Sequence, residues 1–131
     1  CGIFKTELND RLEERLRFIF DSILNLIQAI KPDRISIERV FVNINPASSE
    51  KLIMARTASF LAIAKSGYIV NEFAPNEIKK IVTGNGRSSK KVVKNTIQQI
   101  LNINIKDQHC PTALDATDAL AVALCLGLAA E

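Results

Sequence analysis

Two short segments rich in β-branched and aromatic side chains alternate with longer helical segments, and this order constrains the fold most. Residues 34–42 alternate apolar and polar side chains in the pattern of a half-buried strand, and residues 68–74 form a second such segment. Between them, residues 47–65 are predicted to be helical, with Gly67 in the position that stops a helix. Strands that alternate with helices form sheets with parallel pairs covered by helices. The sequence therefore predicts an α/β fold.

The other helices are predicted from the spacing of apolar residues. Leucine and isoleucine recur every three to four positions across residues 7–30, with charged residues between them. Lys31 and Pro32 end this helix, because a residue before proline avoids the helical conformation. Further helices are predicted at residues 75–82, at 89–101 with Ser88 as the cap, and after residue 112.

The composition is that of an ordinary globular protein. The 131 residues are 47% hydrophobic and 24% charged, which fits one domain with a single core. The longest uncharged apolar run, residues 119–130, is too short to span a bilayer, so we expect no membrane attachment and a cytoplasmic location. The three cysteines have no paired spacing, which argues against a disulfide framework and against a zinc site.

Two aspartates interrupt the apolar helix predicted near the end of the sequence. Asp115 and Asp118 are three residues apart and therefore lie on one helix face, among apolar or small neighbours. An unpaired buried carboxylate costs several kcal/mol of free energy or becomes protonated. Such a pair is more typical of ligands for a hard cation than of a solvent-facing stripe. For Asp115 an alternative stays open, because Thr112 and Asp115 have the spacing of a capping box.

A third acid lies near the C-terminal end of the first predicted strand. Glu38 interrupts the apolar pattern there, in the region where ligand sites of open α/β sheets gather. The alternative is an edge-strand glutamate that faces water. Three converging acids would suit magnesium, which takes oxygen ligands and keeps several waters. Two such ions about 4 Å apart activate water and stabilise the leaving oxygen of a phosphodiester.

Six basic residues gather within sixteen positions that contain no acid. The whole chain carries a net charge of +3 and these residues carry +6, so the remainder carries −3. A local basic excess around a glycine-rich turn suits the phosphates of nucleic acid, and a solvated helix face is the alternative. The six residues are Lys79, Lys80, Arg87, Lys90, Lys91 and Lys94.

Four segments in this order and spacing resemble the RuvC family of Holliday-junction resolvases. The resemblance implies a ribonuclease-H-like fold, in which helices flank a mixed sheet, and a homodimer. It also implies cutting of four-way DNA junctions with Mg²⁺, for which Mn²⁺ substitutes, and branch-migration partners of the RuvA and RuvB type. The segments are IERVF at 37–41, KLIMARTASF at 51–60, KKIVTGNGRSSK at 79–90 and LDATDALAVAL at 114–124.

The resemblance also implies roles for single residues. Lys79 and Lys90 resemble the basic residues that hold the DNA backbone near the scissile phosphate. Phe41 resembles the aromatic residue that meets unstacked bases, and a core phenylalanine is the alternative. The residues that resemble three of the four catalytic carboxylates of the family are Glu38, Asp115 and Asp118.

One element of the family's pattern has no counterpart in this sequence. The family's opening strand, of the form Ile-Asp-Pro-Gly, carries the first catalytic aspartate, whereas residues 1–8 resemble the third strand. Loss of a central strand removes core and exposes backbone groups of its neighbours. We therefore expect residues 1–131 to form a single ribonuclease-H-like nuclease domain that is incomplete at its N-terminus. By itself it is expected to bind branched DNA weakly and not to cut it.

Two other functions stay open on the residues alone. The basic segment would suffice for a non-catalytic nucleic-acid-binding module of the same fold, and the missing aspartate favours that reading. Residues 47–65 are dense in small side chains, which would suit a helical scaffold that pairs with another subunit.

Overall fold

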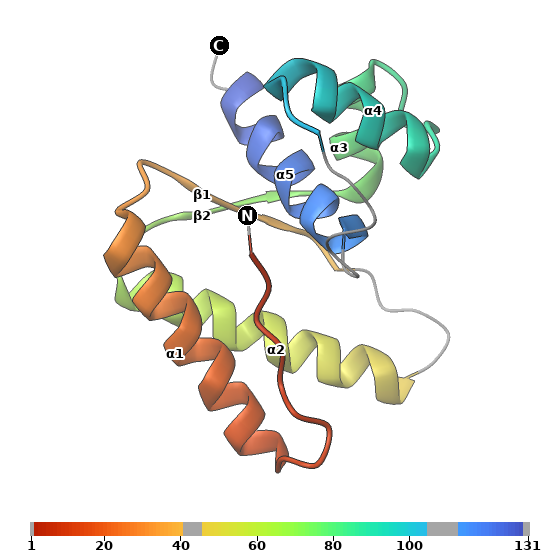
Figure 1. Ribbon diagram of the computed structural model, residues 1–131. Helices are drawn as coiled ribbons and strands as arrows, with labels where there is room; N and C mark the ends of the chain where they lie inside the picture. The colour runs from red at the N-terminus through yellow and green to blue at the C-terminus, as the bar shows by residue number, and fades with distance from the viewer. Residues whose placement is uncertain (1, 41–45, 105–112, 130–131) are drawn as a thin grey trace. The chain divides into compact units, whose positions relative to one another are not determined.

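The computed structural model describes residues 2–40, 46–104 and 113–129 (Figure 1). The chain forms two compact units, which we call the sheet unit and the helical-pair unit. Within the described ranges, no helix is both long and apolar enough to cross a membrane. The sheet unit comprises Cys1–Ile3, Ser36–Arg39 and Asn71–Glu131, and the helical-pair unit comprises Phe4–Ile35 and Val40–Val70.

Two short strands pair in a small parallel sheet. They are β1 (Ile35–Glu38) and β2 (Val70–Phe73), and the Arg39 amide donates a 2.8 Å hydrogen bond to the Phe73 carbonyl just beyond β1. Both strands are shorter than the sequence predicts, because the apolar pattern continues past the residues that pair. The predicted α/β class is confirmed, and the elements from residue 12 onward follow in the predicted order. The strand expected at residues 1–8 is wrong for the part described, because residues 2–7 form neither helix nor strand.

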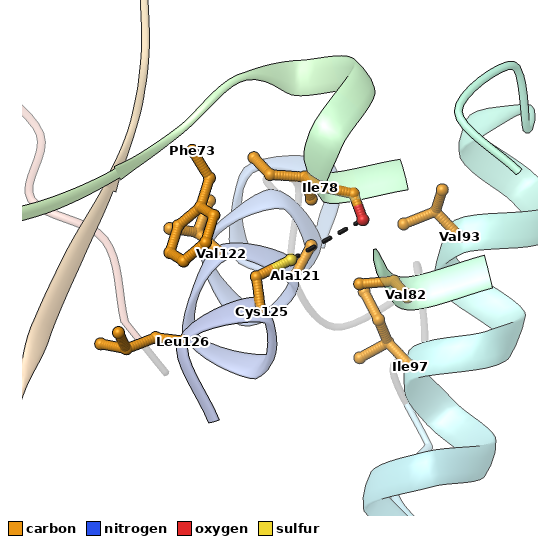
Figure 2. Close-up of a cluster of buried hydrophobic side chains, with 9 residues drawn as sticks. All are labelled: Phe73, Ile78, Val82, Val93, Ile97, Ala121, Val122, Cys125 and Leu126. Carbon is orange, nitrogen blue, oxygen red and sulfur yellow. Dashed lines mark hydrogen bonds between the residues drawn. The ribbon is translucent and has the colours of Figure 1, made fainter. Parts of the chain in front are cut away.

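Three helices of the sheet unit enclose its apolar core (Figure 2). They are α3 (Pro75–Thr83), α4 (Lys90–Leu101) and α5 (Ala113–Leu128). Each contributes apolar side chains four residues apart, which places them on one helix face. The core consists of Phe73, Ile78, Val82, Val93, Ile97, Ala121, Val122, Cys125 and Leu126.

Cys125 belongs to this core as an apolar residue. Its side chain is fully buried, and its thiol donates to the Ile78 carbonyl across 3.7 Å (Figure 2). Burial, assisted by the charge of Glu77, raises the pKa of Cys125 to about 11. The thiol therefore stays protonated at neutral pH and packs like a small hydrophobic side chain.

The turn between α3 and α4 begins at a glycine and ends at a serine cap. Gly84 has φ +80°, a conformation that suits glycine, and closes α3. The Ser89 hydroxyl accepts a 3.3 Å hydrogen bond from the Val92 amide and caps α4. The predicted cap, Ser88, is wrong by one residue, because the Ser88 hydroxyl lies 2.7 Å from that of Thr83 instead.

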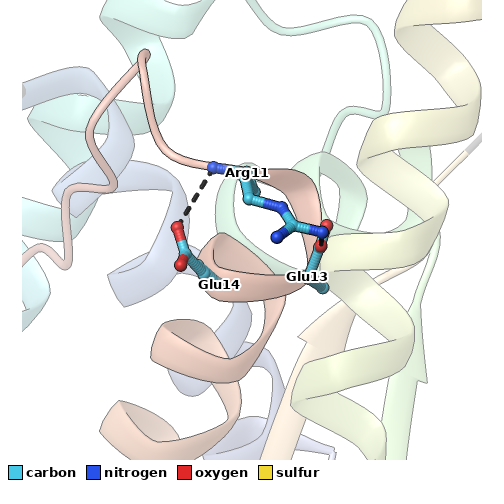
Figure 3. A network of polar contacts seen from close by, with 3 residues as sticks. All are labelled: Arg11, Glu13 and Glu14. Carbon is cyan, nitrogen blue, oxygen red and sulfur yellow. Dashed lines mark hydrogen bonds and ion pairs between the residues drawn. The ribbon is translucent and has the colours of Figure 1, made fainter.

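In the helical-pair unit, α1 (Leu12–Ile30) begins later than its periodicity predicts. The Asp10 amide bonds to the Glu7 carbonyl in a turn, and Arg11 has extended backbone angles. The Glu14 carboxylate then accepts a 3.3 Å hydrogen bond from the Arg11 amide, while Glu13 pairs with the Arg11 side chain (Figure 3). The predicted start near residue 7 is therefore wrong, since the helix begins only after the extended Arg11, whose amide donates to the Glu14 carboxylate of the first turn.

The second helix of this unit, α2 (Pro46–Lys65), packs against α1. Its small residues permit close approach, and Ala58, Ala62 and Ile63 are buried. It ends near Gly67, which has φ +81° as a helix-stop residue requires. The predicted boundaries of this helix are confirmed to within one residue.

Candidate active site

A cavity of about 250 Å³ in the sheet unit gathers two of the predicted acids and two of the predicted lysines. Glu38 reaches it from β1 and Asp118 from α5. Lys79 contributes from α3, and Lys90 from the first position of α4. The remaining lining is apolar and consists of Pro75, Ile78, Val93 and Ala121.

The register between β1 and α5 places the two acids at this cavity. Side chains two residues apart in a strand point to the same face, so Ser36 and Glu38 share one face of β1. The Ser36 hydroxyl donates a 3.1 Å hydrogen bond to the carbonyl of Val122. Val122 lies one helical turn after Asp118 on α5. The hydrogen bond therefore holds β1 against α5 close to both acids, two residues before Glu38 and one helical turn after Asp118.

The surroundings of Glu38 in the cavity change how readily it loses its proton. Partial burial raises the pKa of Glu38, and the negative charge of Asp118 raises it further. Lys90 and Lys79 act in the opposite direction on the same pKa. Two acids and two lysines therefore share one partly enclosed cavity, which is typical of functional sites.

One of the lysines contacts an acid directly. The Lys90 Nζ lies 3.8 Å from the Asp118 Oδ2. The Lys90 side chain is 69% exposed and that of Asp118 is 45% exposed. An ion pair this open to water contributes only about 0–1 kcal/mol. Lys90 can therefore leave Asp118 at little cost in free energy.

A cluster of hydroxyl and amide groups orders the turn between the two lysines. The Thr83 hydroxyl donates to the Lys79 carbonyl (2.8 Å), accepts from the Asn85 amide (3.2 Å) and lies 2.7 Å from the Ser88 hydroxyl. At Gly86 an added Cβ would lie 3.0 Å from the Asn76 carbonyl oxygen, so only glycine fits this approach without a shift. The glycine-rich segment is thus a tightly bonded turn that joins α3 to α4.

Of the three acids predicted to converge, Glu38 and Asp118 lie at the cavity and Asp115 does not. Asp115 is exposed and does not line the cavity, although it lies one turn before Asp118 on α5. Across the described ranges, no group of three or more histidine, cysteine, aspartate or glutamate side chains is placed to hold a metal ion. Thr112, the partner in the alternative capping box, lies outside the described residues.

The other predicted nucleic-acid residues lie around the cavity's lysines in sequence but do not line it. Lys80, Arg87 and Lys91 are exposed, and Lys94 is partly buried. Phe41 lies outside the described residues.

Sequence reasoning missed the residues that hold the site together. The signal for Ser36 was its position two residues before Glu38, on the same strand face. The signal for Thr83 was that it and Ser88, which was predicted only as a helix cap, flank a turn rich in glycine and asparagine.

The donors at the cavity fit a hard divalent cation. Glu38 and Asp118 offer carboxylate oxygens, and the effect of Asp118 on the Glu38 pKa reflects a repulsion that a cation would relieve. Magnesium in proteins is commonly held by one or two carboxylates, with waters and substrate phosphates as its other ligands. Two carboxylates can therefore hold such an ion when water and substrate phosphates supply the other ligands.

Comparison with known proteins gives one consistent family. The family model described as "Crossover junction endodeoxyribonuclease RuvC" matches residues 1–126. The protein of that name from Tolumonas auensis is 40% identical over 124 residues, which cover 95% of this chain and 68% of the relative. The protein from Idiomarina loihiensis is 44% identical over 114 residues, which cover 87% of this chain and 61% of the relative. The chain thus spans about two thirds of the length of these relatives.

The fold comparison agrees with the sequence comparison. The solved structure of Thermus thermophilus RuvC superposes with a TM-score of 0.85 at 25% sequence identity, and the match covers 98% of this chain and 75% of that chain. The expected ribonuclease-H-like class is confirmed by this likeness.

Proposed function

This chain belongs to the RuvC family of crossover junction endodeoxyribonucleases, and on that premise we propose that it supplies the nuclease site of an enzyme that resolves four-way (Holliday) DNA junctions. The observation that carries the proposal is the cavity in which Glu38 and Asp118 lie beside Lys79 and Lys90. It combines carboxylates that can hold a cation with ammonium groups that can hold a phosphate, and a cation so held suits phosphodiester hydrolysis. Nucleases of this family are metal-dependent.

The two acids of the cavity are proposed as cation ligands. Glu38 and Asp118 would hold Mg²⁺, for which Mn²⁺ would substitute. A bound ion of this kind lowers the pKa of water and stabilises the leaving oxygen. Asp115 is proposed as a third carboxylate on the basis of its helix spacing and the family resemblance alone.

The basic residues are proposed to hold the DNA backbone. Lys79 and Lys90 would orient the scissile phosphodiester, because their side chains share the cavity with the acids. The basic residues outside the cavity would neutralise neighbouring phosphates, and Phe41 would meet unstacked bases. These outer phosphate contacts are Lys80, Arg87, Lys91 and Lys94.

Assembly and location are proposed from the family alone. A homodimer would present two such sites to the two strands that must be cut, and branch-migration proteins of the RuvA and RuvB type would deliver the junction. A cytoplasmic location stays a prediction, which cell fractionation would test.

The proposed function is tested by cutting of a synthetic four-way junction in Mg²⁺. The chain is assayed by itself and also in an extended form, in which it replaces the matching segment of the full-length Tolumonas auensis relative. In the extended form, Glu38→Gln and Asp118→Asn should each lower the cutting rate by at least about 100-fold. Replacing a residue that only supports a metal ligand lowers activity by about 10- to 100-fold, and replacing the ligand itself should lower it more. Junction binding should persist in both variants.

The matched control is Glu50→Gln, which neutralises an exposed acid on α2 in the other unit. It should cut like the parent. Equal cutting by Asp118→Asn and the parent would reject the site. Binding without cutting by the extended form would favour a non-catalytic module, and no binding at all would favour a scaffold.

A further inference from the structure

The cavity is balanced in charge without a cation. Glu38 and Asp118 contribute two negative charges, and Lys79 and Lys90 contribute two positive charges. A divalent cation that enters brings two further positive charges. Either the cation binds weakly, or an ammonium group moves away from the acids.

Lys90 is the group placed to move. It contacts Asp118 at 3.8 Å, and most of its side chain is exposed, so it can swing into solvent without disturbing the core. Lys79 lines the same cavity and lowers the pKa of Glu38 less than Lys90 does. Two positive charges about 4 Å apart repel each other, and the repulsion grows where the cavity excludes water.

We propose that Lys90 is the counter-ion that a divalent cation displaces from Asp118, and that the released ammonium group then binds a DNA phosphate. The inference rests on the proposed function, because it takes Glu38 and Asp118 as the cation ligands. Cation and DNA then reinforce each other's binding, since each favours the arrangement in which Lys90 has left the acid. Such coupling is reciprocal and equal in both directions. Lys90 is thus a positioning residue that pairs with Asp118 when no cation is bound and with a DNA phosphate when the cation is bound.

The position of Lys90 in the fold supports this exchange. Lys90 is the first residue of α4, whose N-terminal turn contains no acid and whose cap is the Ser89 hydroxyl. An ammonium group that leaves Asp118 has no second described acid at the cavity except Glu38. A phosphate is therefore the better alternative partner for the displaced group.

The test is the Mn²⁺ affinity of the DNA-free chain, measured by electron paramagnetic resonance of unbound Mn²⁺. Lys90→Gln should bind Mn²⁺ about two- to fivefold more tightly than the parent, which is the range for losing an exposed competing ion pair. The matched control is Lys91→Gln, which removes the same charge one residue away but outside the cavity. Lys90→Arg, which keeps the charge, should stay close to the parent.

A second measurement tests the coupling itself. Fluorescence anisotropy of a labelled four-way junction with Ca²⁺ at constant ionic strength gives the gain in DNA affinity due to the cation. The gain should be larger for the parent and for Lys91→Gln than for Lys90→Gln, whatever the starting affinities.

The outcomes separate this inference from the proposed function. Equal Mn²⁺ affinities of Lys90→Gln and Lys91→Gln, together with loss of binding in Asp118→Asn, would overturn the exchange and leave the nuclease site intact. Mn²⁺ binding that survives in both Asp118→Asn and Glu38→Gln would overturn the site and the exchange with it. Tighter binding in Lys90→Gln alone, lost on adding Asp118→Asn, supports both.

Discussion

The hydroxyl of Ser36 donates a 3.1 Å hydrogen bond to the carbonyl oxygen of Val122, which lies 86 positions later in the chain. Glu38 follows Ser36 on the same strand face, and Asp118 precedes Val122 by one helical turn. The two acids are therefore positioned by the register between β1 and α5. This hydrogen bond joins two elements that lie far apart in the sequence, and each of them carries one of the acids. Its main effect is therefore on the position of the acids rather than on the free energy of unfolding.

Replacing Ser36 by Ala should destabilise the chain by about 0.5–1.5 kcal/mol, the usual net contribution of one hydrogen bond. It should also weaken Mn²⁺ binding, because strand and helix lose a contact beside the acids. Urea denaturation measures the free energy of unfolding. Ser36→Thr, which keeps the hydroxyl, is the control. Unchanged stability and Mn²⁺ affinity in Ser36→Ala would show that the register has another origin.

Glu38 should make stability depend on pH in metal-free buffer. Burial and then Asp118 raise its pKa, so the folded state favours the protonated carboxyl. Its favourable contribution to folding is therefore present below the ordinary carboxyl pKa and is lost as the pH rises through the raised value. The melting temperature of Glu38→Gln should be higher than that of the parent near pH 7.5 in EDTA. The difference in melting temperature should vanish near pH 4. A Gln variant that melts lower than the parent at pH 7.5 would contradict the assigned environment.

The lysines of the cavity should contribute to the salt dependence of DNA binding. Lys79→Ala and Lys90→Ala should each reduce the slope of log K against log salt by about 1, because each removes one phosphate contact. Anisotropy of a labelled junction between low and moderate salt measures the slope. Lys65→Ala, at the end of α2, should leave it unchanged. A slope that stays the same in both cavity variants would exclude phosphate contacts at these lysines.

Thr83 should be the most sensitive polar residue of the turn between α3 and α4. Its hydroxyl donates to the Lys79 carbonyl, accepts from the Asn85 amide and forms a hydrogen bond with the Ser88 hydroxyl. Thr83→Val keeps the shape and should cost about 0.5–1.5 kcal/mol, the usual net contribution of a hydrogen bond, because the partners at this partly exposed turn can bond to water instead. Ser88→Ala should cost less, because it removes one of these contacts. Thermal melting distinguishes the two, and a larger loss for Ser88→Ala would show that Thr83 is not the centre of the cluster.

The order of elements and the face of Glu38 could be predicted from local patterns. The alternation of residues in β1 separates Ser36 and Glu38 from Ile35 and Ile37, and that alternation is encoded within four residues. The small residues and Gly67 fix α2 in the same local way. Fold class follows from such signals because each depends only on neighbours in the sequence.

The remainder depends on contacts between distant residues. Helix spacing puts Asp115 and Asp118 on one face, but only the packing of α5 decides that Asp118 lines the cavity while Asp115 faces solvent. Likewise, the choice of Ser89 over Ser88 as the cap depends on Thr83, which engages the Ser88 hydroxyl. The cavity that Asp118 lines is built from distant elements, and the contact between Thr83 and Ser88, although only five residues long, depends on how the turn between α3 and α4 closes.

Glu38 and Asp118 are proposed to hold one divalent cation between them. Anomalous diffraction from crystals of the chain soaked in Mn²⁺ tests it most directly. We expect a peak within about 2–2.3 Å of a carboxylate oxygen of each residue, the usual distance for a hard cation and an oxygen ligand. Mn²⁺ bound elsewhere on the chain, with no peak between these two carboxylates at saturating concentration, would contradict it.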